Sequence, residues 1–444
     1  MAEERQIKNE IKSDIQKQIL ERNKSRDEVP RQGKLTNLQE FENNDTEDKI
    51  FFNFINSGPR LEIHGKTTNN YDVTFINSKT DEVLKEFKDV KSGEWCQADQ
   101  EYHIPWLITV KDTETGDIRN FSTDLKDKLV FIAYESSALG DTLAWMPVVD
   151  KFREVYGCRV ICSSFHNNLF KDVYPDITFV ERGVPVQGMQ MAFRLGWFGS
   201  GHASNRNPID CHTRNLQEMA MDILGLDFKE IGEQRPKLIG SKKPKLMKAK
   251  KYVAITTCST AQFKYWNRPN GWQEVVNYLN SKGYKVVNIG KQPNNLRDVI
   301  DYTGQRDFDD LQNVIQNASF FIGLPSGLAW LSWALGKKSV MISGISENFC
   351  EFQEDMYRVE NLSVCHGCFN DPSFTFDKGD WLYCPSHKNT AKHFECTKEI
   401  TPQMVKKKIA LVESHLKSKI TPILDYDGNM TSKSTGALIA KYGQ

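Results

Sequence analysis

The sequence predicts an α/β protein in which a small antiparallel β-domain precedes two Rossmann-like halves. Short alternating runs separated by turn residues fill residues 49–126, a pattern typical of antiparallel strands. Continuous apolar runs alternate with amphipathic stretches over residues 127–245 and again over residues 246–415, which indicates parallel sheets covered by helices. Four cysteines with the spacing of a metal site lie within residues 361–400, inside the second half.

The composition excludes several classes of protein. The chain has 444 residues with 58 basic and 58 acidic side chains, and this balance argues against nucleic acid as a partner. Apolar runs such as residues 129–134 are too short to span a bilayer, and the sequence shows no secretory signal. We therefore expect a soluble protein of the cytoplasm.

The N-terminal part divides into a polar arm and the β-domain. Residues 1–48 are rich in Lys, Glu, Gln and Asn with a thin apolar stripe, which indicates a solvated helix or a mobile arm. In the β-domain, "RLEIHG", "YDVTFIN" and "PWLITV" predict strands. This domain has no cluster of His, Cys and carboxylate residues, so an interaction role and a purely structural role are both open.

The first Rossmann-like half begins with "KLVFIAY", which is typical of a strand inside a parallel sheet. A glycine-containing loop, "ESSALGDTLAW", follows this strand, and an amphipathic helix is predicted over residues 146–156. "CRVICSS" and "ITFVER" then predict further strands at the distance of a βαβ unit.

The second half follows a Lys-rich stretch, residues 241–251. "YVAITTCS", "YKVVNIG", "SFFIGLP" and "KSVMIS" predict strands, and helices are predicted over residues 271–281 and 308–317. Ligands of such sheets bind beyond the carboxyl ends of the strands, so the loops there should face one cleft. A capped helix is predicted from Thr401, and residues 416–444 are expected to form a peripheral tail.

Cys365, Cys368, Cys384 and Cys396 have the spacing of one tetrahedral thiolate site. Gly367 supplies the backbone freedom that the turn between the first two cysteines needs. Two disulfides or scattered core cysteines are the alternative, which a reducing cytosol disfavours. Zinc is the usual ion for such a site, although four thiolates bind iron as well. Because a site with four thiolates is closed, we expect one structural ion per chain and chemistry elsewhere.

The first candidate for that chemistry is Asp141 in "ALGDTLAW", which follows Gly140 at a helix start beside the expected cleft. Two roles are open for its carboxylate. As a helix N-cap it would satisfy free backbone amides, which is the commoner role of aspartate at such a position. As a general base it would accept a proton from an acceptor hydroxyl.

A second candidate is the segment "TTCSTAQFKYWNRPNGW", where Thr256, Ser259 and Lys264 stand at or just after the end of a predicted strand. Hydroxyls and an ammonium group suit a diphosphate, which offers several acceptors and about two negative charges. A polar surface loop is the alternative.

The third candidate is "GLPSGLAWLSWALG", in which Pro325, Ser326 and Gly327 turn directly into an apolar helix over residues 328–335. Free amides at that helix N-terminus favour an anionic group such as the diphosphate of a nucleotide sugar. Ser326 as a simple helix cap is the alternative. Because Lys264 should face the same cleft, the combination favours phosphate binding.

In their order and spacing, "LGDTLAW", "TTCSTAQFKYWNRPNGW", "GLPSGLAWLSWALG" and the four-cysteine segment resemble the bacterial autotransporter heptosyltransferases, a branch of the ADP-heptose-dependent heptosyltransferases. The likeness covers residues 128–411. It implies a GT-B fold and an inverting transfer of heptose from ADP-heptose to Ser or Thr hydroxyls of a surface adhesin.

The resemblance also implies roles for single residues. Asp141 matches the base of that family, Lys264 matches its phosphate-contacting lysine, and "PSG" at Pro325 matches its helix start. The family binds iron at four cysteines and assembles into rings of twelve, which implies an iron site and a homo-oligomer here. Two other functions stay open. One is transfer of a sugar from a different nucleotide sugar to lipopolysaccharide or another glycan. The other is non-catalytic nucleotide binding by an interaction protein whose fold a metal ion stabilises.

Overall fold

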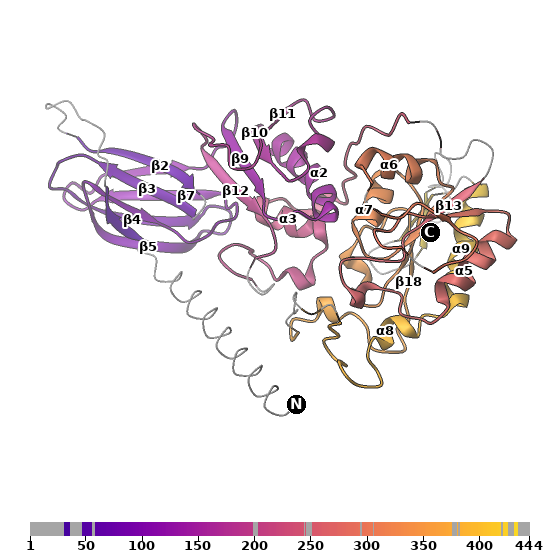
Figure 1. Cartoon of the computed structure of the whole chain (residues 1–444). Helices are drawn as coiled ribbons and strands as arrows, with labels where there is room; N and C mark the ends of the chain where they lie inside the picture. The colour runs from indigo at the N-terminus through magenta and orange to yellow at the C-terminus, as the bar shows by residue number, and fades with distance from the viewer. Residues whose placement is uncertain are drawn as a thin grey trace, which may run out of the picture. The chain divides into compact units, whose positions relative to one another are not determined.

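The computed structural model describes residues 31–35, 47–55, 58–198, 203–243, 245, 251–293, 295–304, 306–374, 380, 382–418, 421–424 and 430–433. Most of the predicted polar arm and most of the Lys-rich stretch fall outside these ranges. The chain divides into two compact units (Figure 1). One comprises residues 1–100 and 104–124, and the other comprises residues 101–103 and 125–444.

The first unit contains antiparallel strands in two sheets, which confirms the predicted β-domain. One sheet has the order β1-β6-β3-β2 and the other the order β5-β4-β7-β8. Alternate side chains of β4 and β7, such as Val73 and Ile108, are buried, as the alternating sequence requires. The strands are β1 (Gln32–Lys34), β2 (Lys49–Ile55), β3 (Gly58–His64), β4 (Asn70–Asn77), β5 (Glu82–Lys91), β6 (Glu94–Gln97), β7 (Trp106–Asp112) and β8 (Ile118–Ser122). β1, within the segment predicted as a polar arm, was not expected.

The second unit begins with a parallel sheet in the order β12-β9-β10-β11. Three of its strands were predicted, whereas β12 was not. The elements of this first half are β9 (Leu129–Tyr134), α2 (Leu139–Tyr156), β10 (Arg159–Ser163), η1 (Asn167–Leu169), β11 (Ile177–Phe179), β12 (Met191–Leu195), η2 (Cys211–Thr213), α3 (Leu216–Leu224) and α4 (Phe228–Ile231).

Helix α2 starts seven residues earlier than the sequence suggested, at Leu139 instead of residue 146. Gly140 indicated a loop, and Pro147 fits the first turn of a helix better than its interior, so local signals favoured the later start. Tertiary packing overrides them, since nearly the whole N-terminal half of the helix is buried. Asp141 therefore lies in the first turn of α2.

The second half of this unit contains a parallel sheet in the order β15-β14-β13-β16-β17-β18. Helices α5 and α9 pack together and share a buried apolar cluster with the strands (Figure 1). The elements are β13 (Tyr252–Ile255), η3 (Gln262–Lys264), α5 (Gly271–Ser281), β14 (Lys285–Asn288), β15 (Ile300–Asp301), α6 (Phe308–Asn317), β16 (Phe321–Gly323), α7 (Gly327–Ala334), β17 (Ser339–Ile342), η4 (Asn348–Cys350), β18 (Met356–Val359), η5 (Cys368–Asn370), α8 (Glu395–Lys398) and α9 (Pro402–Ser418).

The predicted peripheral tail differs from the structure at its start. Helix α9 continues to Ser418, past residue 416, because its apolar positions still face the core at Val412. Beyond it, β19 (Thr421–Leu424) and β20 (Met430–Lys433) form an antiparallel pair. No helix in the described part of the chain is long and apolar enough to cross a membrane.

The two halves meet where α2 and α7 begin, and both contacts depend on glycine. A Cβ on Gly140 would lie 3.0 Å from Cδ1 of Trp330, and a Cβ on Gly327 would lie 3.0 Å from Cβ of Leu139. Larger residues at either position would force the helix ends apart. The contact thus brings the loop after β9 against the loop after β16, as expected for strands whose carboxyl ends face one cleft.

A buried carboxylate, Glu233, also links the halves. Its Oε2 accepts backbone N–H bonds from Gln353 (2.9 Å) and Glu354 (3.3 Å). The side-chain stem is partly exposed, but Oε1 is buried and has no hydrogen-bond partner in the described residues. Burial raises the pKa of Glu233 to about 7, although the two backbone N–H bonds oppose this shift.

This carboxylate predicts a pH-dependent stability. Below pH about 4.5 both the folded and the unfolded chain carry the proton, and as the pH rises towards 7 only the folded chain keeps it. The group therefore makes the free energy of unfolding fall by about 3 kcal/mol over that window. Glu233→Gln should remove this slope, measured by urea unfolding at pH 5 and pH 8. Equal pH dependence in the variant and the parent would contradict the assignment.

Candidate active site and cysteine segment

Asp141 is a buried carboxylate in the first turn of α2, with 9% of its surface exposed. Its Oδ2 accepts a hydrogen bond from Nε1 of Trp197 at 3.1 Å. The N-cap position is occupied by Ala138, and no side chain caps this helix. The interpretation of Asp141 as an N-cap is therefore wrong, because the helix starts two residues before it.

The donor-loop candidates follow β13. Thr256 is buried and its hydroxyl donates to the carbonyl of Cys258 (3.3 Å), so it shapes the loop. Ser259 donates to the carbonyl of Pro325 (3.4 Å), which joins this loop to the "PSG" turn. Lys264 ends the 3-10 turn η3 and is partly buried. Within the described ranges its ammonium group has no ion pair or hydrogen bond, an arrangement suited to an anionic ligand.

The "PSG" turn leads into α7 as predicted. Ser326 occupies the N-cap position, but its side chain caps no backbone amide, and its buried Oγ has no hydrogen-bond partner among the described residues. The alternative that Ser326 is a simple cap is thus wrong. Uncapped amides and an unpaired hydroxyl at one helix start are suited to phosphate oxygens.

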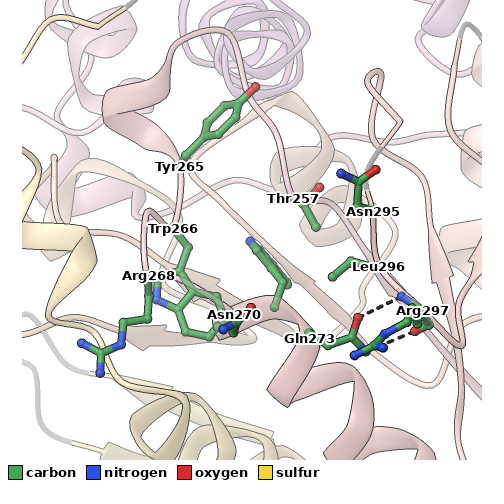
Figure 2. A pocket seen from close by; sticks show the side chains of 11 residues that line it. Thr257, Tyr265, Trp266, Arg268, Asn270, Gln273, Asn295, Leu296 and Arg297 are labelled. Carbon is green, nitrogen blue, oxygen red and sulfur yellow. Dashed lines mark hydrogen bonds between the residues drawn. The ribbon is translucent and has the colours of Figure 1, made fainter.

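A pocket of about 500 Å³ adjoins the donor loop at Thr257 (Figure 2). Aromatic side chains, Tyr265 and Trp266, and the polar side chain of Asn295 contribute to its walls. Gln273 fixes the loop after β14 by accepting from the backbone N–H of Arg297 (2.8 Å) and donating to its carbonyl (3.2 Å). The pocket therefore lies at the carboxyl ends of β13 and β14, where a ligand of this sheet is expected.

The four cysteines of the predicted metal site are free thiols, and three of them are buried. Cys396 shares a hydrogen bond with Cys365 and interacts electrostatically with Cys368 and Cys384. The hydrogen bond with Cys396 lowers the pKa of Cys365 to about 6, whereas the same bond and burial raise the pKa of Cys396. The four cysteines are therefore neighbours in the fold, but among the described residues their sulfur atoms do not form one group within 4.8 Å of one another.

Other potential ligands lie beside these thiols. The ligand atoms of Cys365, His387 and Glu395 are within 4.8 Å of one another. Asp210, Cys211 and His212 form a second such group, in which Nδ1 of His212 and Oδ1 of Asp210 are 2.6 Å apart. The second group consists of consecutive residues already bonded to each other, so the cysteine segment is the better candidate for a metal.

The cysteine segment is anchored to both halves of its unit. The backbone N–H of Gly367 donates to the carbonyl of Gly344 (2.9 Å), in the loop after β17. Asn370 in η5 donates from Nδ2 to the carbonyl of His212 in the first half (2.7 Å). The segment is therefore not a peripheral insertion, because it contacts elements next to the candidate active site.

Sequence reasoning missed Trp197, the hydrogen-bond donor to Asp141. It follows β12, a strand that was not predicted, in the run "MAFRLGWFG". The apolar run before a glycine is the signal that would have found it, since this places Trp197 at the carboxyl end of a strand beside β9.

Comparison with known proteins identifies the family of this chain. The family model of glycosyltransferase family 9 (heptosyltransferase) matches residues 184–348. The autotransporter heptosyltransferase TibC of Escherichia coli O78:H11 is 34% identical over 376 residues, covering 81% of this chain and 88% of TibC. The autotransporter heptosyltransferase BAHTCr of Citrobacter rodentium is 33% identical over 383 residues, covering 83% of this chain and 90% of BAHTCr. The inactive autotransporter heptosyltransferase BimC of Burkholderia thailandensis is 30% identical, covering 70% and 74% of the two chains.

Two crystal structures of TibC share the fold. The first, described as an iron-containing dodecameric glycosyltransferase, has a TM-score of 0.75 at 32% identity and covers 86% of this chain and 100% of TibC. The second, a complex with ADP-D-β-D-heptose, has a TM-score of 0.74 at 31% identity and covers 88% and 99% of the two chains. This chain therefore is a glycosyltransferase and belongs to the autotransporter heptosyltransferase family.

Proposed function

We propose that this protein transfers heptose from ADP-heptose to Ser or Thr hydroxyls of an autotransporter adhesin, with inversion at the anomeric carbon. The observation that carries the proposal is the contact between the two candidate loops: Gly327 of the "PSG" turn packs on Leu139, two residues before Asp141. A base and an anion-binding helix start thus lie at one contact of the two halves. TibC, which has the same fold, binds ADP-D-β-D-heptose.

The geometry suits a direct displacement. Asp141 takes the proton from the acceptor hydroxyl as its oxygen forms a bond to the anomeric carbon. The bond from that carbon to the diphosphate oxygen breaks, and ADP leaves with the electron pair. Lys264, which has no ion pair within the described part of the chain, and the amides at Ser326 stabilise the charge that develops on the leaving diphosphate. The pocket beside Thr257 provides space for another part of the nucleotide sugar.

The cysteine segment fits one structural iron ion, with zinc as the alternative, held by the four cysteines. TibC is described as iron-containing, and the four mutually interacting thiols support a similar site here. A thiolate-bound ion would fix the fold of the segment and supply no step of the sugar transfer.

We further propose that the protein acts in the cytoplasm as a homo-oligomer. All ten cysteines are free, which suits a reducing compartment. TibC is described as dodecameric, and a similar ring of twelve is the assembly proposed for this chain.

The proposed function is tested by incubating the purified protein with ADP-heptose and an unmodified adhesin domain. Mass spectrometry of the adhesin should show heptose additions, and ADP should appear in equal amounts. Transfer to lipopolysaccharide instead of the adhesin would favour the other glycosyltransferase function. Donor binding, detected as a rise in melting temperature, without ADP release would favour a non-catalytic protein. The test for donor binding without ADP release is needed because the relative BimC is described as inactive.

Lys264→Gln is expected to weaken donor binding, because it removes an ammonium group that has no ion pair or hydrogen bond among the described residues and keeps most of the length of the side chain. A charged hydrogen bond of this kind contributes about 1.5–3 kcal/mol, which corresponds to a rise of about 10- to 100-fold in the donor KM. Lys243→Gln is the matched control, since Lys243 pairs with Asp307 and Asp310 on α6. Equal donor KM values for the two variants would contradict the role of Lys264.

A further inference from the structure

The carboxylate of Asp141 is held by an indole group. Nε1 of Trp197 donates to Oδ2 of Asp141 at 3.1 Å, and Asp141 as a whole is 9% exposed. An indole N–H only donates, so it stabilises the ionised carboxylate and fixes its orientation without competing for the proton that a base must take.

Strand pairing places this indole beside α2. β12 and β9 are parallel neighbours, with Leu195 opposite Tyr134, and the backbone N–H of Glu135 donates to the carbonyl of Leu195 (2.8 Å). A Cβ on Gly196 would lie 2.9 Å from Cβ of Glu135, so glycine permits the close approach of the segments that follow β12 and β9. Trp197 is the next residue, and its position relative to Asp141 is therefore set by a rigid sheet.

A second contact of Trp197 comes from the cysteine segment. The ring of Phe369 meets the indole edge to face, with the centroids 5.7 Å apart and the planes at 78°. Phe369 directly follows Cys368 in η5, and its backbone N–H donates to the carbonyl of Ile345 (2.8 Å). The next residue, Asn370, accepts from the backbone N–H of Glu347 (2.8 Å). Phe369 thus has a fixed place against the indole.

We infer that Trp197 is a positioning residue for the base Asp141, and that Phe369 of the cysteine segment buttresses Trp197. The inference rests on the proposed function, because it assumes that Asp141 is the base. It assigns a second task to the cysteine segment, which holds the indole that orients the carboxylate.

Trp197→Phe tests the first step, since it keeps an aromatic ring against Phe369 and removes the N–H. The expected result is a fall in kcat of about tenfold, the size of a hydrogen bond to a charged group. The donor KM and the metal content per chain should stay at parental values. Trp145→Phe is the matched control, because this indole lies on the same helix as Asp141 and donates to the carbonyl of Leu216 (2.9 Å). The Trp145→Phe variant also loses one indole hydrogen bond, but its kcat should stay within about twofold of the parental value.

Phe369→Leu and Phe369→Tyr test the second step. The leucine variant should lower kcat by about 3- to 10-fold, as loss of an aromatic pair permits, and the tyrosine variant should restore it. Unchanged kcat in Trp197→Phe, or a rise in donor KM alone, would overturn the inference. If the tryptophan variant fails to fold, equal kcat in the two Phe369 variants would overturn it.

The inference and the proposed function fail in different ways. In an Asp141→Asn background, Trp197→Phe should cause no further loss of kcat, because both changes act through one carboxylate. Full activity of Asp141→Asn alone would overturn the base assignment and this inference with it. An inactive Asp141→Asn protein together with a fully active Trp197→Phe protein would overturn only the inference.

Discussion

Asp141→Asn is expected to lower kcat by about 10²- to 10⁴-fold, which is the usual contribution of a general base. The amide has nearly the shape of the carboxylate and can still accept from Nε1 of Trp197, so the change removes basicity with little effect on packing. Initial rates of ADP release with saturating ADP-heptose and adhesin measure kcat directly. Donor binding, followed by the rise in melting temperature, should remain.

Asp150 provides the matched control for this substitution. It lies on the same helix, is also buried, and pairs with Arg153 (3.0 Å) and Lys237 (2.9 Å). Asp150→Asn should lower the melting temperature, because Arg153 and Lys237 lose the charge of a buried carboxylate, but it should keep kcat within about twofold. A similar loss of kcat in both variants would show that α2 responds to any lost carboxylate, and the base would have to be sought elsewhere.

The parts of the fold that the sequence predicted are those with strong periodicity. Helices α5 and α6 have the predicted bounds, since Gly271 and Phe308 begin clear amphipathic stretches. The start of α2 was misplaced, because Gly140 and Pro147 are local signals for a loop and a helix start. Packing of Gly140 against Trp330 of the other half decides that start, and such a contact between distant segments leaves no local pattern.

The residues of the candidate site were likewise predicted from the sequence only in part. Asp141, Lys264 and Ser326 stand in motifs whose order and spacing could be recognised, and the structure places all three in segments that follow the carboxyl ends of strands. Trp197 stands in none of these motifs, and its role depends on β12, a strand that was not predicted. The contact of Phe369 with Trp197 joins residues 172 positions apart (369 minus 197), and no spacing rule reports a pairing of that length.

Cys368→Ser is expected to remove the metal ion and loosen the cysteine segment. In the proposed metal site each thiolate is one of four ligands, and metal binding would be coupled to local folding. Metal analysis of the purified protein should fall from about one ion per chain to near none. The melting temperature should fall by several degrees, as a loss of about 2 kcal/mol implies. Cys162→Ser is the control, because Cys162 is a buried thiol in β10 outside the set, and it should keep the ion.

Cys368→Ser should also lower kcat. This result would distinguish a cysteine segment that supports the active site from one that only stabilises the fold. Phe369 follows Cys368 directly and contacts Trp197, so a loosened η5 would release the indole that orients Asp141. The loss of kcat in Cys368→Ser should then be smaller in a Trp197→Phe background than in the parent, since both changes act through one contact. If the losses of kcat are additive in the double variant, the cysteine segment affects catalysis by a route other than Trp197. If kcat is unchanged in Cys368→Ser, the role of the cysteine segment is confined to stability or assembly.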